Sequence, residues 1–323
     1  MLTKRTLLSI AAGALALTVA APVIAQDAFP EKPVRLIVPY SPGGGTDTTA
    51  RIVADNMKEY LGQPVVVENR PGASGTVGTL LAKQAEADGY TILFGIQATL
   101  ALNPSLFKSA TYNSKEDFSG IAVISESPYV VTVPGDSEIS DYEGFAAAAT
   151  ENLTMANGGS AALLAARLLA RQADLSFTNI PYSGSGDAIS DILAGRVNAM
   201  ISSPVSVLPH VESGALKPIL VTSTDRYAAL PDTPTADELG FDGFNVVGWY
   251  SVVAPAGVPQ ERLDVLSDAF NKTIANPDVQ AKLESIGVTP SRRGLDSAAT
   301  TEFIASEVDL WGQEIKDAGI EPK

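Results

Sequence analysis

The sequence contains no cysteine and only one histidine, His210, among its 323 residues. Without cysteine the protein can form no disulfide, and it offers no thiolate to a metal and no thiol nucleophile to a substrate. It also lacks the residue that would carry a lipid anchor at a cleavage site. A hydrophobic fraction of 45% in a chain of this length is enough to build a core by packing alone, so we expect a folded globular protein.

Positive charge is also scarce. Lysine and arginine number 22 against 37 aspartates and glutamates, which gives a net charge of −15. Nucleic acids and anionic membrane surfaces are bound through basic patches, so the composition argues against both as partners. The charge favours solubility and says little about a ligand, because a site can be locally positive inside an acidic protein.

Only one stretch is long and strongly apolar, and it lies at the N-terminus. Lys4 and Arg5 precede an alanine- and leucine-rich run over residues 7–21, and small or medium residues follow at Val23 and Ala25. The run is shorter than the about 20 residues that a membrane-spanning helix needs. We therefore predict a signal peptide over residues 1–25, cleaved after Ala25, and a periplasmic mature protein. The alternative is an uncleaved N-terminal anchor.

Short β-branched runs alternate with helical stretches along the rest of the chain. Predicted strands cover residues 34–38, 65–67 and 91–94 in a first series, then 130–133, 153–156, 177–180, 199–202, 219–222 and 246–253 in a second. The spacing of apolar residues over 50–61 predicts a helix between the first two strands. Strand–helix repetition with short turns predicts right-handed βαβ units and parallel sheets.

Two such series in one chain predict an α/β fold with two lobes and a cleft between them. Residues 26–126 plus 251–323 are predicted to form lobe 1, and residues 127–250 lobe 2. The chain would cross between the lobes near residues 125–131 and 246–253, and two extended crossings make a hinge. The alternative is one large doubly wound sheet.

The end of the chain is predicted to be helical. Asn276 followed by proline, and Asp296, are suitable helix N-caps, and Gly287 is a suitable stop. The sequence shows no repeats and no long flexible linker.

A glycine-rich turn follows the first predicted strand over residues 41–47, with the sequence SPGGGTD. Its glycines allow close approach of a ligand to the backbone, and the free amides of the following helix then favour an anion. Asp47 fits a helix cap or first-turn acid. A dinucleotide-binding turn is a partial match only, because Thr48 stands where the third glycine is needed, and a P-loop fails outright.

The turn after the second strand, residues 72–76, resembles the nucleophile elbow of a hydrolase, with Ser74 at the nucleophile position and Thr76 in place of the final glycine. A serine hydrolase also needs a histidine, and nothing around His210 suggests a triad. No spacing of histidine or acidic residues fits a metal site, so we expect no metal, no cofactor and no catalysis.

The second series repeats the theme of the first. Turns rich in glycine and serine follow its strands at residues 157–160, 182–187 and 202–203. If both sheets face one cleft, these turns converge there and offer amide and hydroxyl donors that suit a carboxylate. The predicted ligand-binding residues are Tyr40, Ser41, Gly43, Gly44, Thr46, Asp47, Ala73, Ser74, Gly75, Thr76, Gln97, Asn157, Gly158, Ser160, Tyr182, Ser183 and Ser202.

Several longer motifs carry a family resemblance across nearly all of the chain after the signal peptide. They are PxKPVR from Pro30, VPYxPGGxxDxxAR from Val38, LGQPVVVENRPGA from Leu61, DGYT from Asp88, NP at Asn103, DF at Asp117, PYxG from Pro181, PDxPT from Pro231 and APAG from Ala254. In these motifs the chain resembles the Bug family, the periplasmic receptors of tripartite tricarboxylate transporters.

The resemblance implies a two-lobed periplasmic-binding-protein fold of the Venus flytrap type, type II, with two strands between the lobes. It implies a small organic acid as ligand, gripped by backbone amides and water at residues 40–47 and 73–76, and the membrane permease of the transporter as partner. Receptors that open and close usually work as monomers, which we expect here.

The chain also departs from the family pattern. Leu163 and Leu164 stand where many members have His-Leu, Ser183 replaces a basic residue of the PYxG motif, and Tyr40 stands where Phe is common. Loss of the basic residue favours a less charged distal end of the ligand. Two other functions stay open from sequence alone: a sensory receptor for the same ligands, and a periplasmic enzyme acting on a small acid through Ser74.

Overall fold

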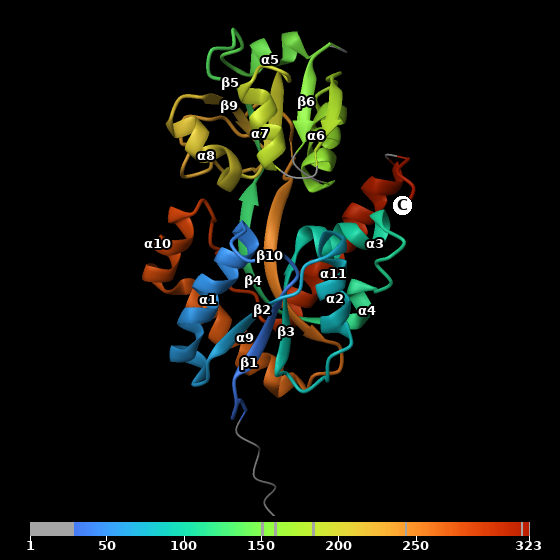
Figure 1. Ribbon diagram of the computed structural model, residues 1–323, viewed down its shortest axis with the longest axis vertical. Helices are drawn as coiled ribbons and strands as arrows, with labels where there is room; N and C mark the ends of the chain where they lie inside the picture. The colour runs from blue at the N-terminus through green and yellow to red at the C-terminus, as the bar shows by residue number, and fades with distance from the viewer. Residues whose placement is uncertain are drawn as a thin grey trace, which may run out of the picture.

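The computed structural model describes residues 29–149, 152–157, 160–182, 185–242, 244–317 and 319–322. Two five-stranded sheets lie one above the other, each with helices packed against it (Figure 1). We call the body that contains the sheet of residues 34–128 and 247–255 lobe 1, and the body that contains the sheet of residues 130–221 lobe 2. The predicted signal peptide falls outside the described residues.

The sheet of lobe 1 has the strand order β2-β1-β3-β10-β4. Its strands are β1 (Val34–Val38), β2 (Val65–Asn69), β3 (Thr91–Ile96), β4 (Phe118–Pro128) and β10 (Val247–Pro255). Leu36 and Val38 of β1 are buried in one hydrophobic cluster, and Ile37 between them is buried in another. Both faces of the sheet are therefore covered, as is usual for parallel strands.

Helices from both ends of the chain cover these faces. Against one face lie α1 (Gly45–Leu61), α9 (Gln260–Ala275) and α10 (Pro277–Ser285), and against the other lie α2 (Thr76–Lys83), the turn η2 (Ala98–Leu102), α3 (Asn103–Leu106) and α11 (Ser297–Asp317). The 3-10 turn η1 (Ala73–Gly75) precedes α2, and the short α4 (Ser114–Asp117) packs beside α11.

The predicted helical features are confirmed in α1 and at the end of the chain. Every apolar residue of the predicted α1 face is buried, from Ala50 to Leu61. Asn276 accepts a hydrogen bond from the Asp278 amide at 2.9 Å, and Asp296 accepts one from the Ala299 amide at 2.8 Å. These caps satisfy amides that a helix leaves free at its first turn.

The sheet of lobe 2 has the order β7-β6-β8-β5-β9. Its strands are β5 (Val130–Pro134), β6 (Thr154–Asn157), β7 (Thr178–Pro181), β8 (Ala199–Ser202) and β9 (Leu216–Val221), and its helices are α5 (Tyr142–Ala148), α6 (Ser160–Gln172), α7 (Ser185–Leu193) and α8 (Pro204–Glu212). Each predicted strand of the second series has an observed counterpart, and the single-sheet alternative is wrong.

The prediction of parallel sheets is wrong for two strands. β10 runs antiparallel to β3 and β4, and β5 runs antiparallel to β8 and β9. β4 carries the chain from lobe 1 directly into β5 with no helix between them, and β10 brings it back in the opposite direction (Figure 1). Strands joined without a crossover helix have no reason to be parallel.

The lobes also touch beside the two crossing strands. On one side, Arg171 of α6 forms an ion pair with Glu314 of α11 at 2.6 Å. On the other, the Tyr227 hydroxyl donates to the Gly287 carbonyl at 3.0 Å. Among the described residues, no helix is both long and apolar enough to span a bilayer.

Candidate functional site

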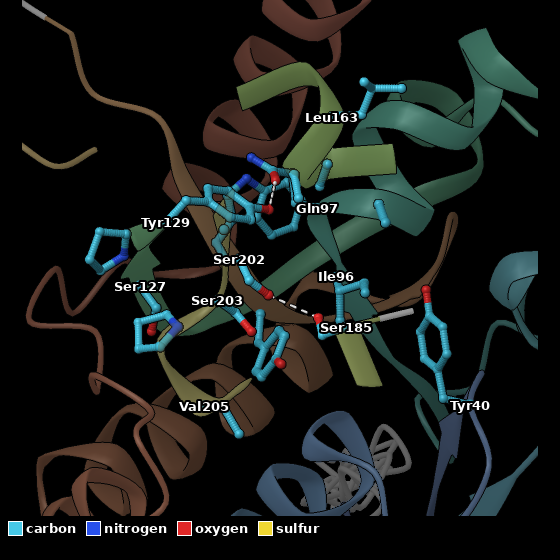
Figure 2. Close-up of a pocket in the computed structure, with 18 of the residues that line it drawn as sticks. Tyr40, Ile96, Gln97, Ser127, Tyr129, Leu163, Ser185, Ser202, Ser203 and Val205 are labelled. Carbon is cyan, nitrogen blue, oxygen red and sulfur yellow. Dashed lines mark hydrogen bonds between the residues drawn. The ribbon is translucent and has the colours of Figure 1, made fainter. Parts of the chain in front are cut away.

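A cleft of about 760 Å³ lies between the lobes. Lobe 1 contributes Tyr40 and Ser74, and the crossing strands contribute polar and aromatic residues of β4 and β10. Lobe 2 contributes the beginnings of α6, α7 and α8 (Figure 2). A volume of this size is in the range of small-molecule sites, which span roughly 300–1,000 Å³.

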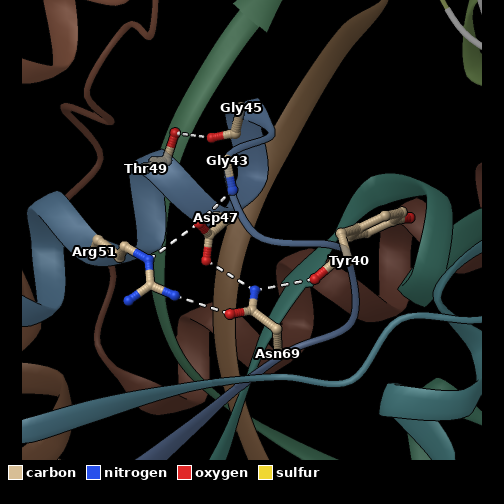
Figure 3. A network of polar contacts seen from close by, with 7 residues as sticks. All are labelled: Tyr40, Gly43, Gly45, Asp47, Thr49, Arg51 and Asn69. Atoms are coloured by element: carbon tan, nitrogen blue, oxygen red, sulfur yellow. Dashed lines mark hydrogen bonds and ion pairs between the residues drawn. The ribbon is translucent and has the colours of Figure 1, made fainter.

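A hydrogen-bond network under α1 shapes the first turn of lobe 1 (Figure 3). The Asp47 carboxylate, 2% exposed, accepts from the Gly43 amide at 2.8 Å, from Asn69 Nδ2 at 2.8 Å and from Arg51 Nε at 3.0 Å. Asn69 Nδ2 also donates to the Tyr40 carbonyl at 3.0 Å. We call Tyr40, Gly43, Asp47, Arg51 and Asn69 the Asp47 brace, because these residues tie the end of β2 to the turn after β1.

The charge of Asp47 is stabilised by the same contacts. Burial alone would raise the pKa of its carboxyl, but hydrogen bonds from Arg51, Gly43 and Asn69 outweigh burial and hold the pKa below the ordinary value of an aspartate. All three donors are part of the protein, so the carboxylate is structural. It fits the predicted first-turn acid.

The brace presents the N-terminus of α1 to lobe 2. A Cβ atom placed on Gly45 would lie 3.8 Å from Cγ1 of Val205 in α8 and 4.0 Å from the Tyr250 hydroxyl. Both Val205 and Tyr250 line the cleft. The amides of the first helical turn have no acceptor within the helix, so this end of α1 is suited to a negatively charged group.

The second turn of lobe 1 has an unusual backbone. Ala73, Ser74 and Gly75 have φ angles of 46°, 54° and 91°. Residues other than glycine rarely adopt positive φ angles, and such a backbone conformation persists only where the surrounding contacts hold it. The Ser74 carbonyl accepts hydrogen bonds from Asn103 Nδ2 at 2.9 Å and from the Tyr40 hydroxyl at 3.3 Å, which fix the turn at the cleft wall.

Gly75 cannot be replaced without disturbing this turn. A Cβ atom at this position would lie 2.6 Å from Thr99 Cγ2 and 3.1 Å from the Tyr40 ring. The next residue, Thr76, is 1% exposed, and its hydroxyl has no partner among the described residues. The turn is therefore tightly packed against Thr99 and the Tyr40 ring.

The floor of the cleft is formed by the crossing segments. Gln97 donates to the Val247 carbonyl at 2.7 Å and accepts from the Tyr129 hydroxyl at 3.3 Å, so it joins both crossings to lobe 1 (Figure 2). Trp249 is 1% exposed, and its Nε1 donates to Glu307 at 2.6 Å. Burial raises the pKa values of the Tyr40, Tyr129 and Tyr250 phenols, which stay neutral.

The wall of lobe 2 has a different character. The Ser185 and Ser202 hydroxyls are 2.9 Å apart, and those of Ser203 and Ser206 are 3.2 Å apart. Leu163 of α6 and Val205 of α8 supply hydrocarbon to the cleft, and the serines lie between them in the view of Figure 2. Short hydroxyl side chains that pair with each other form a wall of weak, neutral hydrogen-bonding groups.

Among the described residues of this wall, Tyr182 is the one that bonds to a charged side chain. Its hydroxyl donates to Asp191 at 2.7 Å, and Asp191 is in turn paired with Arg196 at 2.7 Å. Asp191 therefore orients the Tyr182 hydroxyl.

The family model described as the tripartite tricarboxylate transporter family receptor matches residues 49–320. The chain belongs to this family. Bordetella pertussis BugT is 34% identical to it, over 94% of each chain. The solved periplasmic binding protein BugD is 31% identical, with a TM-score of 0.76 over 91% of this chain and 100% of BugD. The adipate-bound R. palustris protein Rpa4515 is 29% identical, with a TM-score of 0.79 and the same coverage.

Receptors of this family are periplasmic solute-binding proteins rather than enzymes, and this chain has their two-lobed fold. The resemblance found in the sequence motifs is therefore confirmed. Among the described residues, no group of three or more histidines and acidic side chains could hold a metal ion.

Five of the residues predicted to bind ligand line the cleft of this receptor: Tyr40, Ser74, Gln97, Tyr182 and Ser202. Others lie in the same two turns of lobe 1, next to the lining residues: Ser41, Gly43, Gly44, Thr46, Asp47, Ala73, Gly75 and Thr76. Their ligand contacts stay a prediction, and in this set the Asp47 carboxylate is already occupied.

The remaining predicted residues are Asn157, Gly158, Ser160 and Ser183, in the part of the sequence that forms lobe 2. Asn157 ends β6 and is fully buried, and its Nδ2 donates to the Met155 carbonyl and to Asn179. Its Oδ1 has no partner among the described residues. Gly158 and Ser183 fall outside the described residues, and Ser160 begins α6.

Lining residues that were not predicted include two kinds, beside lobe 1 residues such as Asn103 and Phe107. The first kind lies in the crossing segments: Ser125, Ser127, Tyr129, Trp249 and Tyr250. The second kind opens the lobe 2 helices: Leu163 and Val205, together with Ser185 and Ser203, which lie in turns predicted to reach the cleft but were not among the predicted ligand-binding residues. The aromatic pair Trp249-Tyr250 inside a predicted crossing strand was a usable signal for the first kind, because a hinge strand borders the cleft that it opens and closes.

Proposed function

We propose that this protein is an extracytoplasmic receptor that captures a small organic acid in its cleft and delivers it to the membrane permease of a tripartite transporter. One carboxylate of the ligand would lie at the turns of residues 40–47 and 73–76. The predicted cleavage after Ala25, the predicted lobe boundaries and the monomeric state are part of this proposal.

The observation that carries the proposal is the position of the α1 N-terminus. It lies next to Val205 of lobe 2 and the Tyr250 hydroxyl, both of which line the cleft, and the Asp47 brace fixes it there. Amide donors that are already in place favour an anion without a cost of reorganisation. The adipate bound to Rpa4515, a relative of the same fold, agrees with an acid as ligand.

The proposal predicts that organic acids raise the melting temperature of the purified protein. The protein is first unfolded and refolded to remove carried-over ligand, and mass spectrometry checks that it is empty. It is then tested with mono-, di- and tricarboxylates and with the amide of each acid. An acid at about 100 times its dissociation constant stabilises the fold by roughly 2.7 kcal/mol, and the matching amide has little effect.

A charge variant locates the site. Gly45→Asp places a carboxylate at the α1 N-terminus, where the helix tolerates it but a bound anion is repelled. Ala298→Asp, an exposed position in the first turn of α11, is the matched control. We expect Gly45→Asp to lose acid binding at an unchanged melting temperature of the empty protein, and Ala298→Asp to bind normally. Equal binding by both variants, or no response to any acid, contradicts the proposal.

A further inference from the structure

The wall of lobe 2 carries no charged side chain among the described residues that line the cleft. Its members are the aliphatic residues Ala161, Ala162, Leu163, Pro204 and Val205, the hydroxyl residues Ser185, Ser202 and Ser203, and Pro181 and Tyr182. The sequence positions 158–159 and 183–184, next to Asn157 and Ser185 along the chain, are glycine or serine. Neither source provides a cation for the far end of a ligand.

Three arginines on segments that border the cleft are paired with protein carboxylates. Arg196 pairs with Asp191 at 2.7 Å, Arg171 with Glu314 at 2.6 Å, and Arg293 with Glu126 at 2.7 Å. Asp191 in turn holds the Tyr182 hydroxyl at 2.7 Å. Among the described residues of this wall, Tyr182 therefore contacts the acidic member of an ion pair and brings no free cation to the cleft.

A second carboxylate at this wall would be enclosed without a counter-charge. Taking an ionised carboxylate out of water is costly unless a cation or several donors receive it. The Ser185–Ser202 and Ser203–Ser206 hydroxyl pairs, at 2.9 Å and 3.2 Å, each leave one O–H donor free, and the first-turn amides of α7 and α8 are further donors, but all of these groups are neutral. A hydrocarbon body with a hydroxyl or ether group meets no such cost against leucine, valine and serine side chains.

We propose that the ligand carries a single carboxylate, at the lobe 1 turns, and an uncharged, largely apolar body that packs against Leu163 and Val205 within reach of the serine hydroxyls. This inference rests on the proposed function and narrows it. The cleft volume of about 760 Å³ accommodates a body as large as a six-membered ring with substituents. The relative Rpa4515, by contrast, was solved with adipate, a dicarboxylate.

Matched pairs of acids test the inference by calorimetry on the empty protein. Each pair shares one skeleton: hexanoate with adipate, benzoate with benzene-1,4-dicarboxylate, and cyclohexanecarboxylate with its 1,4-dicarboxylate. In every pair of which either acid binds, we expect the monocarboxylate to bind about tenfold tighter or more than the dicarboxylate. A dicarboxylate that binds as tightly as its monocarboxylate, or tighter, overturns the inference but leaves an acid receptor. Absence of binding by every acid of both classes overturns the proposed function as well.

A substitution at Leu163 tests the wall directly. Leu163→Lys adds a cation to a cleft whose described lining residues include none, and Gln172→Lys adds the same charge at the exposed end of the same helix. We expect Leu163→Lys to shift the ratio of the two affinities toward the dicarboxylate by about tenfold or more, and Gln172→Lys to leave the ratio unchanged. An equal shift in both variants assigns the effect to overall charge and overturns the role of the wall.

Discussion

The two walls of the cleft are built on different principles. In lobe 1, the turn after β1 is fixed by the Asp47 brace, and the turn after β2 is fixed by Asn103 and Tyr40 and packed against Thr99. In lobe 2, serine hydroxyls bond mainly to each other beside aliphatic side chains. The wall of lobe 1 is held by several contacts at each turn, so it suits a chemical group that every ligand shares, such as a carboxylate. The wall of lobe 2 is lightly constrained, so it can change with the ligand at little cost to folding.

The largest expected effect comes from a glycine in the rigid wall. In Gly75→Ala the new Cβ clashes with Thr99 at 2.6 Å and has to adopt a φ of about 91°. We expect the free energy of unfolding to fall by about 2–4 kcal/mol and acid binding to weaken at least tenfold. Urea denaturation and calorimetry measure the two quantities.

The control for this variant lies at the other wall. Gly186→Ala places a Cβ at a position in α7 with nothing within 4 Å. Alanine favours a helix by roughly 0.5–1 kcal/mol over glycine, so we expect a small gain in stability. If both variants lose stability equally, the contrast between the walls is wrong.

An intermediate effect is expected from the brace. Asp47→Asn keeps the shape of the side chain but removes the charge that Arg51 and the Gly43 amide stabilise. We expect a loss of about 1–3 kcal/mol in the free energy of unfolding at pH 7. The exposed pair of Asp268 with Lys272 supplies the control, because Asp268→Asn is expected to cost less than about 0.5 kcal/mol.

The same variant has a defined pH dependence. The folded pKa of Asp47 lies below its unfolded value, so its ionised form stabilises the fold at any pH above the unfolded pKa of about 3.9. That contribution is lost as the pH falls below about 4 and through the folded pKa. The difference in melting temperature between the native protein and Asp47→Asn should therefore be constant from pH 5 to 8 and shrink toward pH 3. A difference that grows in acid contradicts the assignment.

The smallest effect is expected where the two lobes meet. Arg171→Ala removes the ion pair with Glu314, in which the arginine side chain is 57% exposed. Exposed pairs are worth less than about 1 kcal/mol, so we expect the dissociation constant of the acid to change by less than about fivefold, and less again at high salt. Arg196→Ala, which removes a pair within lobe 2, is the control. A larger change would show that the Arg171–Glu314 ion pair helps to hold the two lobes together around the ligand.

Sequence patterns predicted the local elements well and their directions poorly. The buried face of α1 and the strands of both lobes follow from apolar spacing, which local sequence records. The long strand β4 was missed because Ser125, Glu126 and Ser127 interrupt its apolar run near the hinge. The antiparallel direction of β10 depends on where the chain has been before, and no local pattern records that.

The candidate site shows the same division. The two lobe 1 turns were predicted because glycine-rich turns before helices have a physical signature. The roles of Gln97 and Tyr129 at the crossings depend on contacts over 150 and 32 residues of sequence, so they required the fold. The neutrality of the lobe 2 wall likewise became visible once the lining residues were brought together.

The pairing of β4 with β10 has a consequence for how such receptors can diversify. Pro128, where the chain leaves lobe 1, lies opposite Val247, where it returns. Everything between is one uninterrupted segment whose two ends are neighbours in the same sheet. A recombination event with only two junctions can therefore exchange an entire lobe between related genes and leave the opposite turns intact, so that a new specificity is acquired as a single cassette.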